Sequence, residues 1–308
     1  MKPHYELDMA SDAPSCLEVY KTLRLLSLEN CNHNSNNLRL PFGIYNISIN
    51  RICEKLILLS KKLENYFDKS YLLEHLEEKS TLRQEIVDYI ELSLYSAAEH
   101  IDDLDSIASG FYKNIKTNKR FISSFTNSIK HNQSRIRIFS TEFSNGKFSG
   151  CLHGYFIEGV KAGAVGPSES FHLTESIYSI TTLIWEIILL LLNCSRDLNE
   201  FLINTGSQII GPVNTQFDAF QLAINSAARL PLYTFGEAHP FEHTKFSLLY
   251  EDDAILYFQS ACFGSLIKGW DRSALTTFGK SKINFESDGV TKTFNIPIPK
   301  IINLQHWG

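Results

Sequence analysis

Apolar residues recur at helical spacing through the first half of the chain. One stripe predicts a helix over residues 50–68, and a second predicts a longer helix over residues 80–112. A third helix is expected over residues 117–133, where Phe121, Phe125 and Ile129 repeat every four residues. The first half is therefore expected to be an antiparallel helical bundle. The first two stripes consist of Ile52, Leu56, Leu59, Leu63 and Phe67, and of Leu82, Ile86, Ile90, Leu94, Ala97, Ile101, Leu104, Ala108 and Phe111.

The hydrophobic period changes near residue 134, from helical spacing to the alternation typical of strands. RIRIFSTEF and KFSGCLHGYFIEGV flank Asn145-Gly146, which suits the positive φ angles of a type I′ turn and predicts a β-hairpin. A second hairpin is predicted around Asp288-Gly289, between KINFE and TKTFNI. Strands are also expected at KFSLLY and AILYF, although AILYFQSACFGSLI is equally compatible with a helix.

The most hydrophobic run is TTLIWEIILLLLN, at residues 181–193. It predicts a fully buried helix that begins near Pro167 and continues to about residue 203, and a shorter helix is expected over residues 215–229. The fold class is therefore α+β. Residues 1–133 are expected to form the helical bundle region, and residues 134–308 an α+β region with β-hairpins and the buried apolar helix. No flexible linker separates the two, so one shared core also fits the pattern.

Composition places the chain among soluble globular proteins, since 44% of its 308 residues are hydrophobic and 20% are charged. The apolar run at 181–193 is shorter than the ~20 residues that cross a bilayer, and the N-terminus has no apolar signal segment. Six cysteines, at positions 16, 31, 53, 151, 194 and 262, are widely spaced without a CxxC pair, which favours free thiols in a reducing compartment. We therefore expect a cytoplasmic protein with no membrane partner.

The net charge of −5 gives no general attraction to nucleic acid, so a phosphate-bearing partner would need a local basic patch. The charges are strongly segregated. From Ser106 to Thr141 there are seven Lys or Arg residues and no Asp or Glu, whereas Glu64 to Asp105 holds twelve acidic residues and three basic ones. One interpretation is an acidic helix that attracts a basic helix in antiparallel contact. The other is a basic site for phosphates.

A polar stripe runs along the third predicted helix and continues just beyond it. In the functional interpretation, Arg120, Lys130 and Arg135 hold a phosphate and His131 transfers protons. In the structural interpretation, the same residues are a solvated helix face. The stripe consists of Arg120, Ser124, Asn127, His131 and Arg135, with Lys130 and Asn132 beside it.

A further pair lies near the end of the second predicted helix, where His100 and Asp103 are one turn apart. This spacing allows a carboxylate–imidazole pair, which Arg120 could approach if the second and third helices are antiparallel. The pair is compatible with an acid–base unit and also with a histidine that is satisfied at the edge of the core.

Two long helices followed by the polar segment NSIKHN resemble the HEPN superfamily of helical bundles, over residues 50–135 at most. Many HEPN proteins are metal-independent ribonucleases of bacterial toxin–antitoxin and antiviral systems, and two copies of their Arg…His motif usually meet across a dimer. The resemblance implies His131 as the catalytic base or acid and an arginine that stabilises the charged phosphorane. The arginines differ from the family pattern, because Arg120 precedes His131 by eleven residues and Arg135 follows it.

HPFEH, at residues 239–243, matches the H-x-x-E-H string of inverted zincins. In those enzymes two histidines bind zinc and the glutamate activates water, which would assign His239, Glu242 and His243 to a metal site. Pro240 lies inside the string and a strand pattern follows it, so a helix through the motif is not expected.

The sequence therefore favours a nucleic-acid- or phosphate-directed effector without a cofactor, with RNA as the expected partner and homo-oligomer formation or a partner protein. Its most specific form is a HEPN-like ribonuclease in bacterial antiviral defence. The alternative is a non-catalytic assembly subunit whose second and fourth helices pack against partner copies.

Overall fold

The structure is a computed structural model, and it describes a large part of the chain. The described residues are 6–8, 19–26, 39–69, 76–108, 110–131, 135–144, 149–161, 164–167, 178–205, 218–230, 233–234, 245–249, 257–260, 281–287, 290–296 and 300–301.

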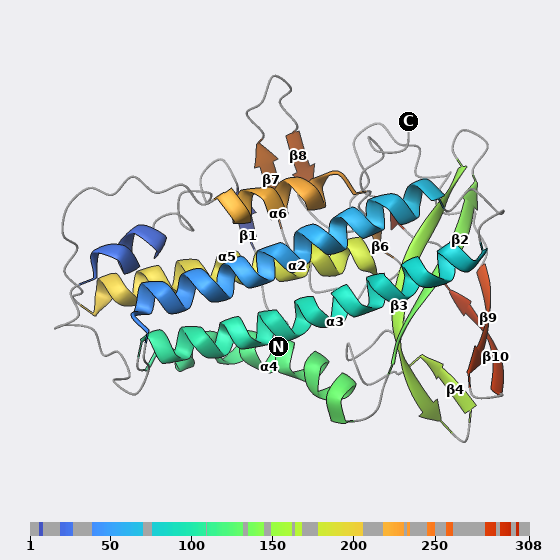
Figure 1. Cartoon of the computed structure of the whole chain (residues 1–308), viewed down its shortest axis with the longest axis horizontal. Helices are drawn as coiled ribbons and strands as arrows, with labels where there is room; N and C mark the ends of the chain where they lie inside the picture. The colour runs from blue at the N-terminus through green and yellow to red at the C-terminus, as the bar shows by residue number, and fades with distance from the viewer. Residues whose placement is uncertain are drawn as a thin grey trace.

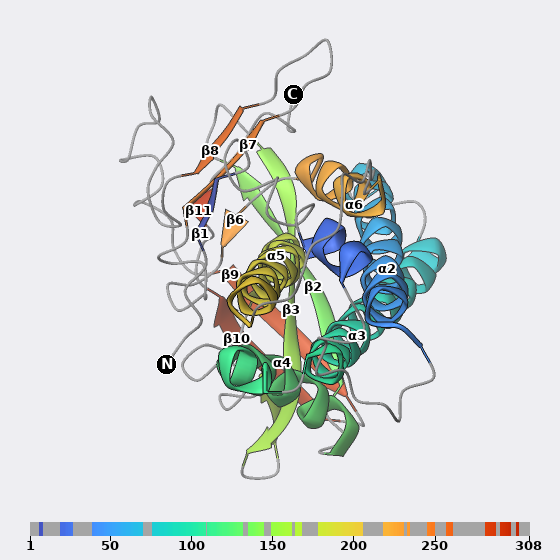
Figure 2. The same ribbon diagram turned by 90° about the vertical axis from the view of Figure 1, so that its left-hand side faces the viewer.

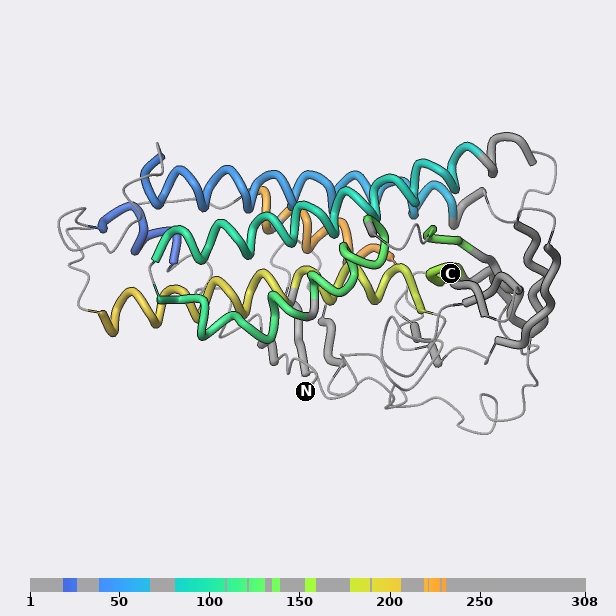
Figure 3. Tube along the Cα trace, turned by 90° about the horizontal axis from the view of Figure 1, so that it is seen from below, coloured from blue at the N-terminus to red at the C-terminus, as the bar shows by residue number. Residues whose placement is uncertain are grey.

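Long helices along a common axis form most of the described structure (Figure 1). Seen from below, they form an elongated bundle in which successive helices run in opposite directions (Figure 3). A short helical segment at residues 19–25 packs beside them. The helices are α2 (Pro41–Lys69), α3 (Leu76–Ile107), α4 (Tyr112–His131), α5 (Ile180–Asn204) and α6 (Asp218–Ala228).

The apolar stripes expected for the first two long helices are confirmed, because their described side chains are buried where α2 packs on α3. α2 begins at Pro41, nine residues before the predicted start. Proline is favoured at the first helical position, and Ile44, Tyr45 and Ile49 extend the buried stripe toward it.

α3 ends at Ile107 rather than near 112, and α4 begins at Tyr112 rather than near 117. The reason lies at Gly110, whose φ of 90° is incompatible with a continued right-handed helix and is readily adopted by glycine. The backbone N–H of Phe111 still donates to the carbonyl of Ala108 (3.0 Å), which keeps the turn tight. The two helices therefore lie antiparallel (Figure 1).

α5 lies among the other helices when the bundle is viewed along its axis (Figure 2). This position explains its composition, since a helix that is apolar on all sides is surrounded by protein. The expectation of a buried helix is confirmed, but the expected start at Pro167 is wrong. Pro167 ends strand β4, and α5 begins at Ile180, where the Ser179 side chain caps it by accepting from the N–H of Thr182 (3.4 Å).

The first predicted hairpin forms at one end of the bundle, from β2 (Ile136–Ser144) and β3 (Ser149–Lys161). Its register pairs Ser144 with Ser149, so residues 145–148 connect the strands. The type I′ turn expected at Asn145-Gly146 lies outside the described residues. Two short strands, β4 (Ala164–Pro167) and β5 (Tyr178–Ser179), pair with β3.

The second predicted hairpin consists of β9 (Ser281–Ser287) and β10 (Val290–Ile296), and the pairing of Ser287 with Val290 confirms its two-residue connection. The strands expected near 245 and 257 are β7 (Lys245–Leu249) and β8 (Tyr257–Ser260), which pair antiparallel. β1 (Glu6–Asp8) adds to β7 in parallel, and β6 (Tyr233–Thr234) pairs with β11 (Lys300–Ile301).

One hydrophobic cluster contains residues from both sides of the boundary expected near residue 134, from Val19 to Leu230. The apolar stripes of α3 and α5 are buried inside this chain, so burying them does not require partner copies. None of the helices in the described part of the chain has the length and apolar character that a membrane span needs.

Candidate functional site

α4 presents a polar face to solvent that is rich in cations and carries no carboxylate. Lys113, Lys116 and Arg120 are exposed along its first half, and Ser124 and Asn127 continue the same stripe. The opposite side of the helix packs against α3 and α5 and buries Ile115, Ile122 and Phe125. Amphipathic spacing therefore turns the polar stripe of the sequence outward, as expected for Arg120 and Asn127.

The first turn of α4 concentrates positive charge. It contains Lys113 and no acidic residue, and Lys116 follows one turn later. The N-terminus of a helix already carries a partial positive charge from its aligned peptide dipoles, so cations there are unfavourable and anions are favourable. The sequence gains nothing for local stability from this arrangement, which makes the positive end of α4 a candidate for contact with an anion.

Lys119 connects α4 to the acidic helix α3. Its ammonium Nζ lies 2.7 Å from Oδ1 of Asp102 and 5.1 Å from the centre of the Tyr112 ring. The hydrogen bond and charge of Asp102 raise the pKa of Lys119, so the ammonium is held in its charged form. The interpretation of an acidic helix beside a basic one thus applies to Lys119, while Lys113, Lys116 and Arg120 form no ion pair with any described residue.

Lys130, near the other end of α4, has its ammonium 4.6 Å from the centre of the Tyr95 ring on α3. This is a cation–π contact, and the side chain of Lys130 is otherwise exposed. Lys130 therefore lies on the flank of α4 that faces α3 rather than in the stripe of Arg120 and Asn127.

The basic run continues past α4 with Arg135 and Arg137, and the hairpin uses part of it. Arg137 Nε lies 2.6 Å from Oε2 of Glu158 on the neighbouring strand, and the backbone carbonyl of Arg135 accepts from the N–H of Glu158 (2.8 Å). The side chain of Arg135 is exposed. Arg135 thus stays available to solvent at the point where α4 gives way to β2.

His131 is the last residue of α4, and its side chain and the whole of Asn132 lie outside the described residues. The helix nevertheless fixes how far His131 stands from Arg120. Eleven residues at 1.5 Å each separate the two by about 16 Å along the axis. The backbones of Arg120 and His131 are therefore about three turns of α4 apart. Arg135 is nearer to His131 in the chain.

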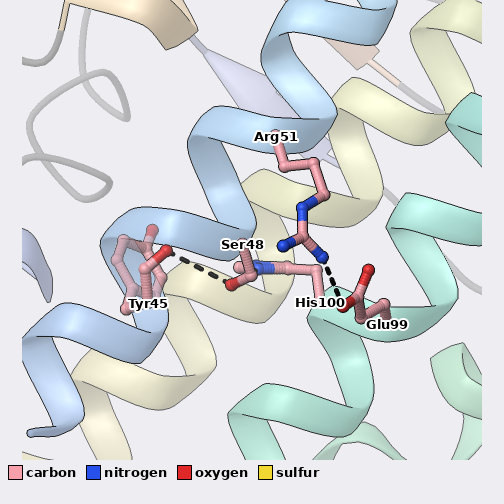
Figure 4. Close-up of polar contacts among 5 residues, drawn as sticks. All are labelled: Tyr45, Ser48, Arg51, Glu99 and His100. Carbon is pink, nitrogen blue, oxygen red and sulfur yellow. Dashed lines mark hydrogen bonds and ion pairs between the residues drawn. The ribbon is translucent and has the colours of Figure 1, made fainter. Parts of the chain in front are cut away.

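His100 of α3 is fully buried where α3 packs against α2 (Figure 4). Its Nδ1 lies 2.7 Å from the hydroxyl of Ser48, which also contacts the carbonyl of Tyr45 at 3.2 Å. The ring of Tyr45 packs edge-on against the imidazole, with centroids 5.6 Å apart, and the Tyr45 hydroxyl lies 2.8 Å from Ser195 on α5. His100 thus belongs to a polar contact that links α2, α3 and α5.

Ser48 contacts both the carbonyl of Tyr45 and Nδ1 of His100, and the tautomer of the ring decides whether Ser48 or Nδ1 donates between them. Nε2 has no hydrogen-bond partner among the described residues. Burial lowers the pKa of His100 from 6.5 to about 3, so the ring is neutral near pH 7.

Asp103 does not pair with His100, because Nδ1 of the ring contacts Ser48 and Nε2 has no hydrogen-bond partner among the described residues. Of the two interpretations that the sequence allows, the structure therefore fits the histidine at the core rather than the carboxylate–imidazole pair. Burial, reinforced by the charge of Glu99, raises the pKa of Asp103 to about 6 although Arg51 opposes the shift. Arg51 itself forms an ion pair with Glu99 at the surface (Figure 4).

A second buried polar group lies where the first hairpin meets α5. Glu186, which interrupts the apolar run of α5, is 1% exposed, and Tyr155 of β3 is fully buried. Burial and then the charge of Glu186 raise the pKa of Tyr155 well above its usual value. His153, two residues earlier on β3, is also buried and packs on the Tyr66 ring with centroids 4.3 Å apart.

Sequence reasoning missed Lys113, Lys116 and Tyr112 as members of the α4 surface. The third helix was expected to begin near residue 117, so these residues fell outside it. Their spacing from Arg120 was the available signal, since 113, 116 and 120 follow the i, i+3, i+7 pattern of one helix face.

The possible zinc ligands His239, Glu242 and His243 lie outside the described residues. Within the described ranges, no group of three or more His, Cys, Asp or Glu side chains could hold a metal ion. Cys53 and Cys194 are buried thiols, and Cys194 accepts a hydrogen bond from Asn118 (3.4 Å).

No protein-family model, no curated protein and no solved structure matches the chain.

Proposed function

We propose that this protein binds RNA through the phosphates of its backbone, along the solvent face of α4. The observation that carries the proposal is the exposed row of Lys113, Lys116 and Arg120 on a helix without a carboxylate, in a chain whose net charge is −5. Since an acidic protein has no general attraction for polyanions, a local cationic face of this kind is what phosphate contacts require.

The second half of the same face carries polar groups that can contact the phosphates and sugars of a nucleotide. Ser124 and Asn127 are exposed beyond Arg120 and offer a hydroxyl and an amide, which can donate to phosphate oxygens or contact sugars. From Lys113 to Asn127 the helix rises about 21 Å, so one strand could contact several of these groups at once.

The resemblance to HEPN ribonucleases adds a second part to the proposal, which is that the protein cleaves the RNA that it binds. His131 at the end of α4 would take the proton of a ribose 2′-hydroxyl, whose oxygen attacks the adjacent phosphorus to form a 2′,3′-cyclic phosphate. The bond from phosphorus to the 5′-oxygen breaks, and that oxygen leaves as a hydroxyl after it takes a proton from water. Arg135, four residues further on and exposed, would stabilise the charged phosphorane, while Arg120 would bind phosphate at a distance from it. A cytoplasmic effector in bacterial antiviral defence is the setting that this resemblance implies.

Cleavage is tested by incubating the purified protein with mixed RNA in the presence of a chelator. Cleavage by the wild type that His131→Ala abolishes and the neighbouring Lys130→Gln retains is the expected result. Equal cleavage by the wild type and His131→Ala would remove His131 from the reaction. No cleavage by any of them would leave a binding protein rather than a ribonuclease.

Binding is tested separately, with a labelled RNA and fluorescence anisotropy. The variant with Lys113→Gln, Lys116→Gln and Arg120→Gln is expected to lose affinity, because each removed cation gives up a phosphate contact. A matched control replaces Lys21, Arg24 and Lys61, which are two lysines and one arginine, also exposed but outside α4. Equal loss in both variants would contradict the proposal, since it would indicate a general charge effect.

The alternative of a non-catalytic assembly subunit rested on apolar helices that pack against partner copies. The apolar stripes of α3 and α5 are buried within this chain, whereas Leu92 of α3 and Ile203 of α5 are exposed.

A further inference from the structure

Tyr112 is the aromatic residue among the large apolar side chains that are exposed in the described part of the chain, with 39% of its surface accessible. It stands at the first position of α4, directly before Lys113 and one turn before Lys116. The ring of Tyr112 is therefore exposed at the N-terminal end of the cationic face of α4, beside the lysines that would bind RNA phosphates.

The ring belongs to a set of side-chain contacts between α4 and α3. Lys119 Nζ lies 5.1 Å from the ring centre and 2.7 Å from Oδ1 of Asp102. The cation–π contact favours ring orientations beside Lys119. A side chain whose orientations are already restricted loses less entropy when a ligand binds.

Tyr95 provides a comparison within the same molecule. Lys130 Nζ lies 4.6 Å from its ring centre, yet Tyr95 is only partly exposed and sits on α3 between the two helices. At Tyr95 the cation–π contact therefore contributes to the packing of α4 on α3. Tyr112 differs because its ring is more exposed and lies next to Lys113 and Lys116.

We propose that Tyr112 is a stacking platform for a base of single-stranded RNA, whose neighbouring phosphates are bound by Lys113, Lys116 and Arg120. Proteins that bind single strands combine a cationic track with aromatic rings on which bases stack. In a duplex the bases are already stacked on one another inside the helix, so a ring on the protein surface gains nothing from them. This inference rests on the proposed function and adds that the substrate is single-stranded.

The charge of α4 would also fit an acidic protein segment, but such a partner does not require an exposed aromatic ring beside the cations. The position of Tyr112 therefore favours a partner that brings both phosphates and flat bases. A polyglutamate peptide serves as the competitor that separates the two.

The experiment measures fluorescence anisotropy with three labelled probes of equal length: a single-stranded RNA, an RNA duplex and an abasic ribose-phosphate strand. The wild type is expected to bind the single strand more tightly than the other two probes. Tyr112→Ala is expected to weaken single-strand binding about tenfold and to leave abasic binding unchanged, because only stacking is lost. Tyr112→Phe keeps the ring and should bind like the wild type.

Several outcomes would overturn the inference. Unchanged single-strand binding by Tyr112→Ala, equal loss of abasic binding, or a preference for the duplex would each remove the platform. If one of these three results is obtained and the triple variant at Lys113, Lys116 and Arg120 still loses affinity, the proposed RNA binding stands without a stacking role for Tyr112. Absence of RNA binding by the wild type, or displacement of RNA by polyglutamate at matched charge, would overturn both. Tyr112 is exposed, so melting curves of the variants should match the wild type and confirm that they fold.

Discussion

The structure decides between the two interpretations that the sequence allows for His100. In the sequence it lies at the edge of an apolar stripe, one turn from Asp103, which is compatible with a surface acid–base pair. In the structure it is fully buried, because Tyr45 and Ser48 of α2 cover that flank of α3. The helix pattern of α3 could not reveal this, since burial of a boundary residue depends on what another helix places against it.

The buried imidazole makes stability depend on pH. The pKa of His100 is about 3 in the folded protein against 6.5 for the unperturbed group, so folding favours the neutral ring. Above pH 6.5 both states are neutral and the full stability is present. As the pH falls from 6.5 toward 3, only the unfolded chain binds the proton, and the free energy of unfolding decreases by about 1.4 kcal/mol per pH unit from this group.

Urea unfolding at a series of pH values checks this, with His100→Gln as the non-titrating variant. The wild type should lose stability relative to the variant below pH 6.5, so that the difference between them shrinks or reverses as the pH falls. A difference that stays constant down to about pH 4 would show that His100 does not titrate as a buried neutral ring.

At the scale of the element, α4 combines a well-formed apolar face with an unfavourable distribution of charge. The stripe of Ile115, Ile122 and Phe125 holds it against α3 and α5, as helical spacing predicts. Lys113 in its first turn opposes the helix dipole, whereas Lys130 in its last turn complements it. The solvent face was predictable from periodicity. The start of the helix was not, because Gly110 at a φ of 90° ended α3 early and released five further residues to α4.

Replacing Lys113 separates stability from binding. Lys113→Glu is expected to raise the free energy of unfolding by ~0.3–1 kcal/mol, because a carboxylate in the first turn complements the helix dipole. The same change is expected to weaken RNA binding. Thermal melting and anisotropy measure the two effects.

Lys130→Glu is the matched control at the opposite end of α4. It should lower stability, since it places a negative charge at the negative end of the dipole and removes the contact with the Tyr95 ring. If Lys113→Glu also lowered stability, the lysine would have a structural partner, and its assignment to an anion site would lose its physical basis.

At the scale of the whole molecule, periodicity predicted the existence and order of the helices and both hairpins. It did not predict how they assemble. The apolar character of α5 indicated burial, but only the packing shows that α5 lies among α2, α3, α4 and α6 and so covers stripes that were expected to seek partner copies.

The candidate site was predictable to the same degree. Arg120 and Asn127 lie on the solvent face, as their spacing indicated. The distance from Arg120 to His131 was underestimated, because residues on one face of a helix can still be several turns apart. Side chains on one face of a helix point in the same direction. They can contact the same small ligand only if they are also close in sequence.

The exposed cations of α4 are proposed to neutralise RNA phosphates, and the salt dependence of binding measures how many phosphates they contact. For single strands, log affinity falls with log salt concentration with a slope of about −0.7 per phosphate contact, so Lys113, Lys116 and Arg120 should contribute about −2 to the slope. We expect the variant that replaces all three with Gln to bind more weakly and to show a slope shallower by about that amount, while the control variant at Lys21, Arg24 and Lys61 keeps the wild-type slope. A triple variant with the wild-type affinity and slope would contradict the account.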